Sequence, residues 1–334
     1  MKELITAVSL LYSIPVCRIV PLKDEKVFRI ITKKERFVLK LLPFPTMETG
    51  FITDAMTYLS FNGFHRFNEI IPTAEGKPFG RCQGRVALLT KELCGRVPSY
   101  KRTDDIIAVA SCLAELHHAA RYFLPVHRYE ERIKWGTMTD TIDHGRKDLL
   151  LFRSRLGLQK KRCDFDEAFL GACDPFIEEA ENASASLKTF YPQLCAEHAV
   201  YGGFCHHDPA HHNFLIDSDG KAAVFDFDYA IADLRAHDVA AFLLKVVKAN
   251  HWEIEPALVA LNAYHRLFPL SPRENRFIYC LLTYPYDFHH AAYARYEEHN
   301  FTRRIEKKLF RVIREKERRE DLLKKVRPFL SEGS

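Results

Sequence analysis

The sequence has no apolar run close to the ~18 residues that a bilayer-spanning helix needs, so we expect no membrane partner. Its nine cysteines are scattered along the chain and include no C-x-x-C pair. Their odd number also argues against a disulfide framework, and we expect cytoplasmic synthesis under reducing conditions. A net charge of only +5 over 334 residues, without aromatic residues interleaved on a basic groove, indicates no nucleic-acid partner.

The apolar segment Leu4–Cys17 imitates a secretion signal but lacks its other features. Glu3 occupies the region that should be positively charged. Leu4, Val8 and Leu11 recur at helical spacing, which predicts an amphipathic helix instead.

Residues 17–91 are predicted to form several short strands and one helix. Short polar turns separate the first three apolar runs, which is typical of antiparallel strands. The predicted strands are Cys17–Pro21, Lys26–Thr32, Arg36–Leu42, Glu69–Thr73 and Arg85–Lys91, with a helix over Met47–Leu59.

The chain after residue 100 is predicted to be mostly helical. Gly95 and Pro98 mark a connector before it, because both residue types interrupt regular structure. The predicted helices are Asp104–His118, Asp148–Leu156, Phe165–Leu170, Pro175–Thr189 and several more from Asp238 onward. The sequence therefore predicts an α+β protein with a small five-stranded antiparallel lobe (1–92), a hinge (93–100) and a helical lobe (101–334).

The most informative stretch is the predicted hairpin segment 201–228. It contains His206-x-Asp208, then Asn213 five residues after that aspartate, then Asp226. Between Asn213 and Asp226, two apolar runs flank the polar turn Asp217–Gly220, as in a β-hairpin. Such a hairpin returns the second aspartate to the loop that holds the first.

This pattern is the one by which phosphoryl-transfer enzymes position their charged groups. Asp208 is the candidate catalytic base, which takes the proton of an acceptor hydroxyl. Asn213 and Asp226 offer the hard oxygen atoms that Mg²⁺ prefers. Lys40, on the third strand, would steady the phosphates of ATP, and a carboxylate on the next helix, Asp54 or Glu48, would hold Lys40.

Through this motif, the sequence resembles the aminoglycoside phosphotransferase and choline kinase family, within the protein-kinase-like superfamily. The resemblance covers essentially the whole chain. Four further segments resemble the spore-coat CotS/CotI branch: FRIITKKERFVLKL (28–41), Tyr58-Leu59 followed by Gly63-Phe64, LLTKELCGR (88–96) and LAELH (113–117).

The resemblance implies a bilobal kinase-like fold and ATP- and Mg²⁺-dependent phosphorylation of a small-molecule hydroxyl. It implies that adenine meets the backbone near Thr90–Leu93, which includes Glu92. For coat members it also implies expression in the mother cell and deposition on the spore coat. One departure is the segment Val20–Glu25, which contains no glycine where a phosphate-covering loop normally has it.

Two other interpretations stay open. A metallohydrolase would use the pairs His206-His207 and His211-His212 as ligands, although Pro209 interrupts the helix on which such ligands usually lie. A non-catalytic kinase-fold protein of the spore coat would keep the fold for binding alone. Separately, the basic segment Arg303–Arg327, which holds twelve Lys/Arg against five Asp/Glu, could dock an acidic partner, whether another coat protein, a polyanion or a phosphorylated ligand.

Overall fold

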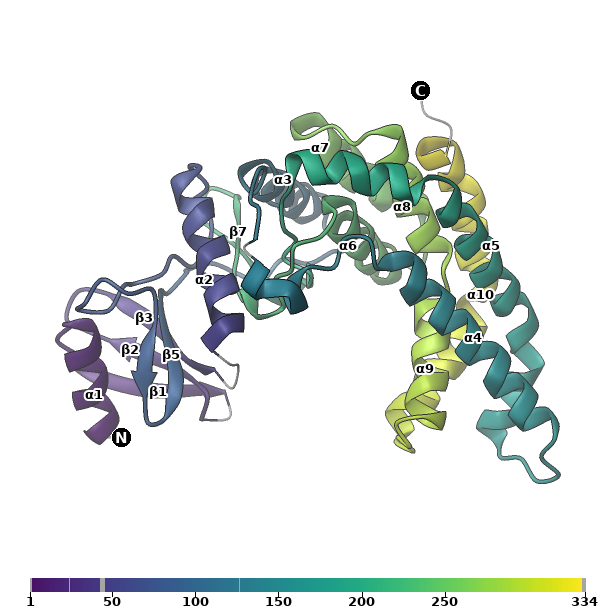
Figure 1. Cartoon of the computed structure of the whole chain (residues 1–334), viewed down its shortest axis with the longest axis horizontal. Helices are drawn as coiled ribbons and strands as arrows, with labels where there is room; N and C mark the ends of the chain where they lie inside the picture. The colour runs from purple at the N-terminus through teal and green to yellow at the C-terminus, as the bar shows by residue number, and fades with distance from the viewer. Residues whose placement is uncertain (1, 24, 43–45, 126, 332–334) are drawn as a thin grey trace. The chain divides into compact units, whose positions relative to one another are not determined.

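The computed structural model describes residues 2–23, 25–42, 46–125 and 127–331 (Figure 1). The chain divides into two compact units. The first comprises Met1–Ile133, Tyr201–Arg235 and Val259–Phe268, and the second Lys134–Val200, Ala236–Leu258 and Pro269–Ser334. This division differs from the predicted lobes, whose boundaries remain a prediction. Among the described residues, no helix is both long and apolar enough to cross a membrane.

The first unit contains a five-stranded antiparallel sheet, as predicted. Its strand order is β1-β2-β3-β5-β4. Hydrophobic residues of one face form a core in which Ile30, Leu39 and Leu89 are fully buried. The strands are β1 (Arg18–Lys23), β2 (Val27–Ile31), β3 (Arg36–Leu42), β4 (Gly80–Cys82) and β5 (Arg85–Lys91).

One predicted strand, Glu69–Thr73, is wrong. Its residues make only an isolated bridge, between Ile70 and Thr90, and the chain then turns because Thr73 N–H donates to the carbonyl of Lys77. The fifth strand is β4, which forms a tight hairpin with β5. Gln83 and Gly84 between them both have positive φ (51° and 75°), the conformation of a two-residue hairpin turn.

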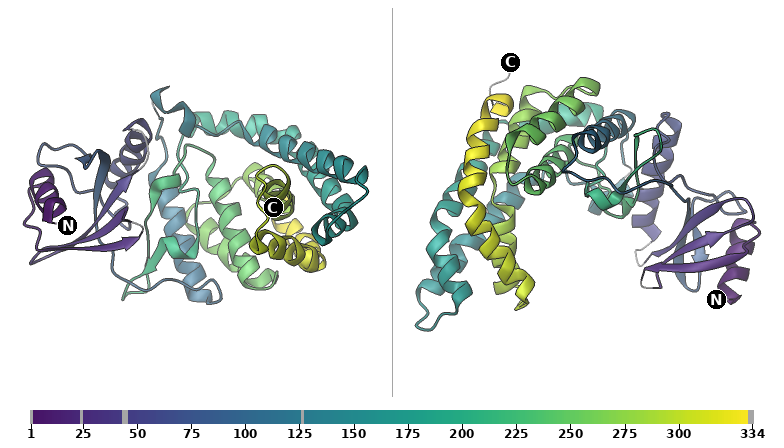
Figure 2. Two further views of the ribbon diagram at one scale, coloured as in Figure 1. Left: turned by 90° about the horizontal axis from the view of Figure 1, so that it is seen from below. Right: turned by 180° about the vertical axis from the view of Figure 1, so that it is seen from behind.

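The N-terminal helix α1 (Lys2–Tyr12) packs on this sheet (Figure 2). Leu4 and Val8 are buried in the same hydrophobic core, which confirms the predicted amphipathic helix. The hydroxyl of Tyr12 donates to the carbonyl of Ala87 at 2.8 Å. Burial raises the pKa of Tyr12 well above its usual range, so this donor keeps its proton.

The predicted hairpin is confirmed by β6 and β7, which pair antiparallel from Phe214–Val224 to Ile216–Ala222. The connector before the helices lies against β6, because Arg96 and Ile216 exchange two backbone hydrogen bonds of 3.0 and 2.8 Å. Gly95 permits this approach: a Cβ there would lie 2.6 Å from the carbonyl oxygen of Ile216. The other elements are α2 (Thr46–Phe61), α3 (Thr103–Ala119), η1 (His127–Arg132), η2 (His211–Asn213), β6 (Phe214–Ile216), β7 (Ala222–Val224) and η3 (Phe227–Tyr229).

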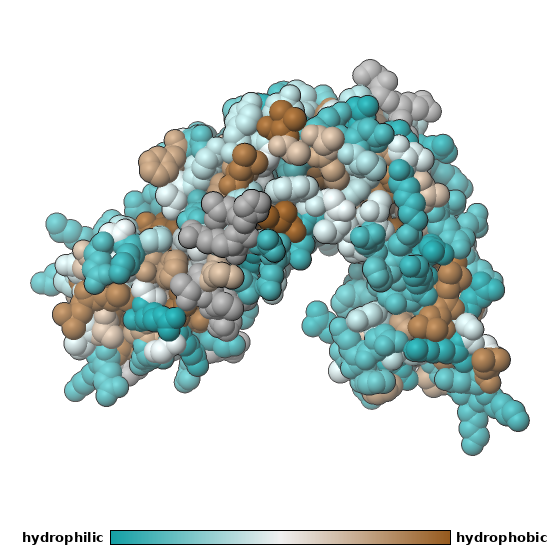
Figure 3. Space-filling model, viewed as in Figure 1, coloured by the Kyte–Doolittle hydropathy of each residue, from teal (hydrophilic) through white to brown (hydrophobic). Residues whose placement is uncertain are grey.

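The second unit is helical. In it α10 packs along α8 and α9, and Figure 2 shows α10 in yellow beside α9. Hydrophilic residues predominate on the face drawn in Figure 3, and hydrophobic ones are scattered or in small groups. The helices of the second unit are α4 (Met138–Gly157), α5 (Asp164–Tyr201), α6 (Arg235–Ala249), α8 (Pro272–Thr283), α9 (Tyr286–Tyr296) and α10 (Arg303–Ser331). Helix α7 (Ile254–Leu267) is divided between the two units.

The two helices predicted at Phe165–Leu170 and Pro175–Thr189 are wrong as separate elements. They form one 38-residue helix, α5, with Pro175 in its interior. Pro175 looks like a first-turn residue from sequence, because proline costs least there. However, Phe169, Cys173 and Phe176 continue one buried stripe past it, and their packing maintains the helix.

Asp287 is expected to make the second unit acid-sensitive. Its carboxylate lies 2.5 Å from Lys248 Nζ and 3.2 Å from Lys308 Nζ. Burial alone would raise the pKa of Asp287, but the two ammonium groups outweigh it and hold the pKa at about 2. This carboxylate therefore contributes stability above its unfolded pKa of ~3.9, and loses that contribution as pH falls through about 2.

We therefore expect Asp287→Asn to lower the free energy of unfolding by ~2 kcal/mol at pH 7. The difference from wild type should shrink between pH 4 and pH 2, as measured by urea unfolding. Glu298→Gln is the control, because Glu298 is an exposed acid in the same unit. An equal effect of both variants at pH 7 would contradict the assignment.

Candidate functional site

A buried histidine, His206, holds the loop that contains Asp208, in the first unit. His206 is fully buried, and its Nε2 donates to the carbonyl of Phe225 at 2.9 Å, next to Asp226. In that tautomer Nδ1 accepts from the N–H of Asp208, at 3.4 Å. Tyr100 closes the loop from the other side, because its hydroxyl donates to the carbonyl of Pro209 at 2.9 Å.

Asn213 orients the carboxylate of Asp208. Its Nδ2 donates both to the carbonyl oxygen of Asp208 and to its Oδ2, each at 2.9 Å. The backbone of Asn213 also accepts from Phe225 N–H at 3.0 Å, so the hairpin returns Asp226 beside this residue. The side chain of Asn213 is buried, whereas Asp208 remains partly accessible, as its predicted role as a base requires.

Lys40 joins the sheet to the end of the hairpin. Its Nζ lies 2.5 Å from Asp226 Oδ1 and 2.9 Å from Asp228 Oδ1. Asp226 has left-handed backbone (φ 70°, ψ 63°), a conformation that aspartate tolerates better than most residues. Lys40, Asp226, Asn213 and Asp208 are thus connected through side-chain and backbone contacts.

The charges in this group affect one another's pKa values. Burial disfavours the ammonium of Lys40, but Asp228 and Asp226 outweigh it and raise the pKa of Lys40. Burial acts on Asp226 too, yet Lys40 keeps the pKa of that carboxyl below its usual value. The pKa of Asp228 is raised by burial and by the neighbouring Asp226.

The other predicted residues have different partners. Glu48 Oε2 accepts from Arg132 at 2.6 Å, and Asp54 Oδ2 accepts from the hydroxyl of Tyr129 at 2.6 Å. In the described part of the chain, the ion pairs of Lys40 are those with Asp226 and Asp228, and neither helical carboxylate joins them.

Glu92 lies directly after β5, at the end of the predicted small lobe and just before the predicted hinge. Its Oε1 accepts from Arg29 Nε on β2 at 2.6 Å. Its backbone N–H donates to the carbonyl of Arg36 at 3.1 Å. The side chain of Glu92 is thus held on the sheet, and its backbone lies in the segment where adenine is expected.

Sequence reasoning missed the roles of Asp228 and Arg132. From the sequence, Asp228 could either line the cleft or bond within its loop, and the spacing Asp226-x-Asp228 was a usable signal for the first. Arg132 had no local signal, because its partner Glu48 is 84 residues away.

The oxygen atoms gathered here fit a divalent metal ion. Asp226 and Asp228 present two carboxylates, and the amide hydrogens of Asn213 point to Asp208, so its Oδ1 remains as the ligand atom. Such an all-oxygen set suits Mg²⁺ or Ca²⁺ rather than zinc.

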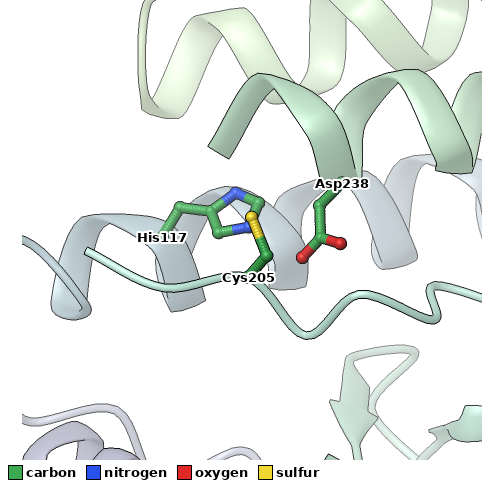
Figure 4. A group of neighbouring side chains, drawn as sticks. All are labelled: His117, Cys205 and Asp238. Carbon is green, nitrogen blue, oxygen red and sulfur yellow. The ribbon is translucent and has the colours of Figure 1, made fainter. Parts of the chain in front are cut away.

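The histidine pairs do not form the metal cluster that a metallohydrolase needs. Over the residues that the structure describes, none of these four histidines belongs to a group with metal-ligand geometry, and Figure 4 shows two other buried side chains of the first unit, His117 and Cys205. These two buried side chains already have partners. His117 Nδ1 lies 2.8 Å from the hydroxyl of Tyr264, and Cys205 Sγ lies 3.1 Å from the carbonyl of Leu234. The third side chain in Figure 4, Asp238, belongs to the other unit.

Comparison with known proteins agrees with this geometry. A family model described as the phosphotransferase enzyme family matches residues 21–274. The chain is similar to spore coat protein S of Bacillus subtilis, with 23% identity over 71% of this chain and 68% of that protein. It is also similar to a homoserine kinase of Nitrobacter winogradskyi, with 27% identity over 61% of this chain and 55% of that protein.

Solved structures confirm the predicted α+β, bilobal, kinase-like fold. An aminoglycoside phosphotransferase from Alicyclobacillus acidocaldarius has a TM-score of 0.86 at 20% identity, over 98% of this chain and 96% of that one. The amicoumacin kinase hAmiN, in complex with AMP-PNP, Ca²⁺ and Ami, has a TM-score of 0.63 at 14% identity, over 97% and 93%. The family and coat-protein resemblance inferred from sequence is also confirmed.

Proposed function

Since this chain belongs to the phosphotransferase enzyme family, we propose that it transfers the γ-phosphoryl group of ATP, with Mg²⁺, to a hydroxyl group of a small molecule. The observation that carries the proposal is the connected group of Lys40, Asp226, Asn213 and Asp208. A binding protein without chemistry would not need a carboxylate oriented by an amide beside a lysine–aspartate pair.

Each residue has a role in the proposed reaction. Asp208 accepts the proton of the acceptor hydroxyl while the oxygen of that hydroxyl bonds to the γ-phosphorus of ATP. The bond between the γ-phosphorus and the β,γ-bridging oxygen breaks, which releases ADP. Asn213 keeps the carboxylate of Asp208 in position. Lys40 binds the phosphates. Mg²⁺, held by Asp226 and Asn213 with Asp228 beside them, would neutralise charge on the phosphate oxygens.

The nucleotide base is proposed to meet the backbone of Thr90–Leu93, with Glu92 in that segment. Support comes from β5, which is buried as far as Thr90 and then leads into the connector. The segment Val20–Glu25 contributes no glycine to cover the phosphates. Lys40 and the metal ligands must therefore supply most of the phosphate binding.

The acceptor is proposed to be a small polar alcohol. One relative is a homoserine kinase and one structural neighbour an aminoglycoside phosphotransferase, so hydroxyl-bearing small molecules are the common class. Similarity to a spore coat protein supports synthesis in the mother-cell cytoplasm and deposition on the spore coat. The boundary of the small lobe at residue 92, with a hinge to 100, is part of the same proposal.

The experiment that tests this function is a transfer assay. Purified protein, ATP and Mg²⁺ are incubated with a panel of amino alcohols, sugars and aminoglycosides, and ADP release is measured against a no-acceptor control. We expect acceptor-dependent ADP release with at least one compound. Bound nucleotide without acceptor-dependent turnover across the panel would contradict the proposal.

A second candidate function, docking on other coat proteins, is favoured by one surface of α10. Five exposed cations follow one another at intervals of three and four residues, so they fall within ~80° of the helix circumference over ~21 Å. The ion pairs that α10 makes within the described residues use Lys308, Lys316, Arg319 and Lys325 instead. We call these five residues the basic stripe: Arg304, Lys307, Arg311, Arg314 and Arg318.

The basic stripe is expected to bind an acidic polypeptide. A helix with carboxylates at the same intervals would match the charges one for one, whereas a DNA strand curves away from a straight row. Wild type should bind poly-L-glutamate with an affinity that falls with added salt. The triple variant Lys307→Glu/Arg311→Glu/Arg314→Glu should bind at least about tenfold more weakly, equivalent to ~1.4 kcal/mol. Equal binding by both proteins, or a preference of wild type for duplex DNA, would contradict it.

A further inference from the structure

The contacts that join η1 to α2 in the first unit include an ion pair and a hydrogen bond. Arg132 Nη2 donates to Glu48 Oε2 at 2.6 Å, and the hydroxyl of Tyr129 donates to Asp54 Oδ2 at 2.6 Å. Both carboxylates belong to α2, the helix expected from sequence to hold Lys40. Their partners lie on η1 instead.

The other half of the Arg132 side chain holds the segment after Asp226. Its Nη1 donates to the carbonyls of Asp228 and Ala230, at 2.8 and 3.1 Å. The carbonyl of Arg132 also accepts from Ala232 N–H at 2.8 Å. Arg132 therefore fixes residues 228–232 through both its side chain and its backbone.

The burial of Arg132 makes these bonds consequential. It is only 8% exposed, and a buried guanidinium is costly unless its donors are satisfied in good geometry. The planar fork of arginine reaches Glu48 with one nitrogen and the two carbonyls with the other, an arrangement that lysine cannot reproduce. An apolar side chain would fill the same space at a lower free-energy cost, but it would make no directional hydrogen bonds to Glu48 or to the two carbonyls.

We propose that the Glu48–Arg132 ion pair is a positioning device for the phosphoryl-transfer site, through which α2 sets the place of Asp228. Asp228 binds Lys40 through its carboxylate at 2.9 Å and Arg132 through its carbonyl at 2.8 Å. Thus α2 acts on Lys40 indirectly, by way of Arg132 and Asp228, rather than by an ion pair of its own. The inference rests on the proposed function and assigns Glu48 and Arg132 as positioning residues.

The kinetic test compares Glu48→Ala with Tyr129→Phe. Glu48 is partly exposed, so its truncation should leave the protein folded. We expect Glu48→Ala to lower kcat by about 100-fold, the cost of a displacement of about 1 Å at a reacting centre. The KM for nucleotide should stay within about twofold. Tyr129→Phe removes the hydrogen bond between η1 and Asp54 on α2 without touching residues 228–232, and should keep the wild-type kcat.

Arg132→Lys keeps the charge but loses the fork, so we expect a loss of kcat similar to that of Glu48→Ala. Combined with Glu48→Ala it should add little, because the two residues act as one unit. A wild-type kcat in Glu48→Ala, or an equal loss in Tyr129→Phe, would overturn the inference.

Amide hydrogen exchange tests the same coupling without turnover. Glu48→Ala should speed exchange at Ala230 and Ala232 by at least about tenfold, through local opening, while Tyr129→Phe leaves these amides unchanged. If wild type transfers no phosphoryl group but exchange rises as stated, the proposed function fails and the coupling of α2 to residues 228–232 stands. Unchanged exchange in Glu48→Ala overturns the coupling itself.

Discussion

Asp208→Asn is expected to lower phosphoryl transfer by about 10²–10⁴-fold while nucleotide affinity stays within about twofold of wild type. The amide has nearly the shape of the carboxylate, and its oxygen can still accept from Asn213, which now bonds Asp208 Oδ2 at 2.9 Å. It cannot, however, take a proton from the acceptor hydroxyl. ADP release in the transfer assay and calorimetric titration with an ATP analogue measure the two quantities.

The matched control for that variant is Asp217→Asn. Asp217 lies in the exposed turn of the same hairpin, where Oδ1 accepts from the N–H groups of Asp219 and Lys221, each at 2.9 Å. Asparagine serves the same turn, so this control should retain wild-type transfer. Full transfer by Asp208→Asn would show that another group takes the proton.

Asp226→Ala is expected to weaken Mg²⁺-dependent nucleotide binding by about 100-fold, or ~2.7 kcal/mol. The substitution removes the carboxylate at the end of β7 and leaves Lys40 with Asp228 alone. Nucleotide affinity in EDTA should change much less, because the metal carries the difference. Calorimetric titration of an ATP analogue with Mg²⁺ and with EDTA gives both values.

Backbone strain must be separated from this effect, because Asp226 has a φ of 70°. Alanine in left-handed backbone costs ~1 kcal/mol, whereas asparagine tolerates it. Asp226→Asn therefore removes the charge with little strain, and should show most of the same loss of Mg²⁺-dependent affinity. If Asp226→Asn binds the Mg²⁺-nucleotide as wild type does, Asp226 is not a metal ligand.

Local patterns in the sequence predicted much of this fold. The hairpin between Asn213 and Asp226 follows from two apolar runs around a polar turn, and the structure confirms it. The edge strand was misplaced because β4 is only three residues long and depends on the Gln83-Gly84 turn. Helix α5 was divided because buried packing on both sides of Pro175 outweighs the local cost of proline.

The candidate site was predictable only where spacing determines it. Asp208 and Asn213 lie five residues apart, and their contact follows from the loop itself. By contrast, Lys40 and its partner Asp228 are 188 residues apart in the sequence. Arg132 and its partner Glu48 are 84 residues apart. Such contacts depend on how distant elements pack, and single residues carry no signal for them.

The central claim is that Lys40, Asn213 and Asp226 bind one Mg²⁺-nucleotide beside Asp208. A crystal structure with a nonhydrolysable ATP analogue and Mg²⁺ tests it most directly. The account predicts the metal on oxygen atoms of Asn213 and Asp226, Lys40 on the phosphates, and the adenine along Thr90–Leu93. A nucleotide bound elsewhere, or a metal ion without Asp226 among its ligands, would contradict it.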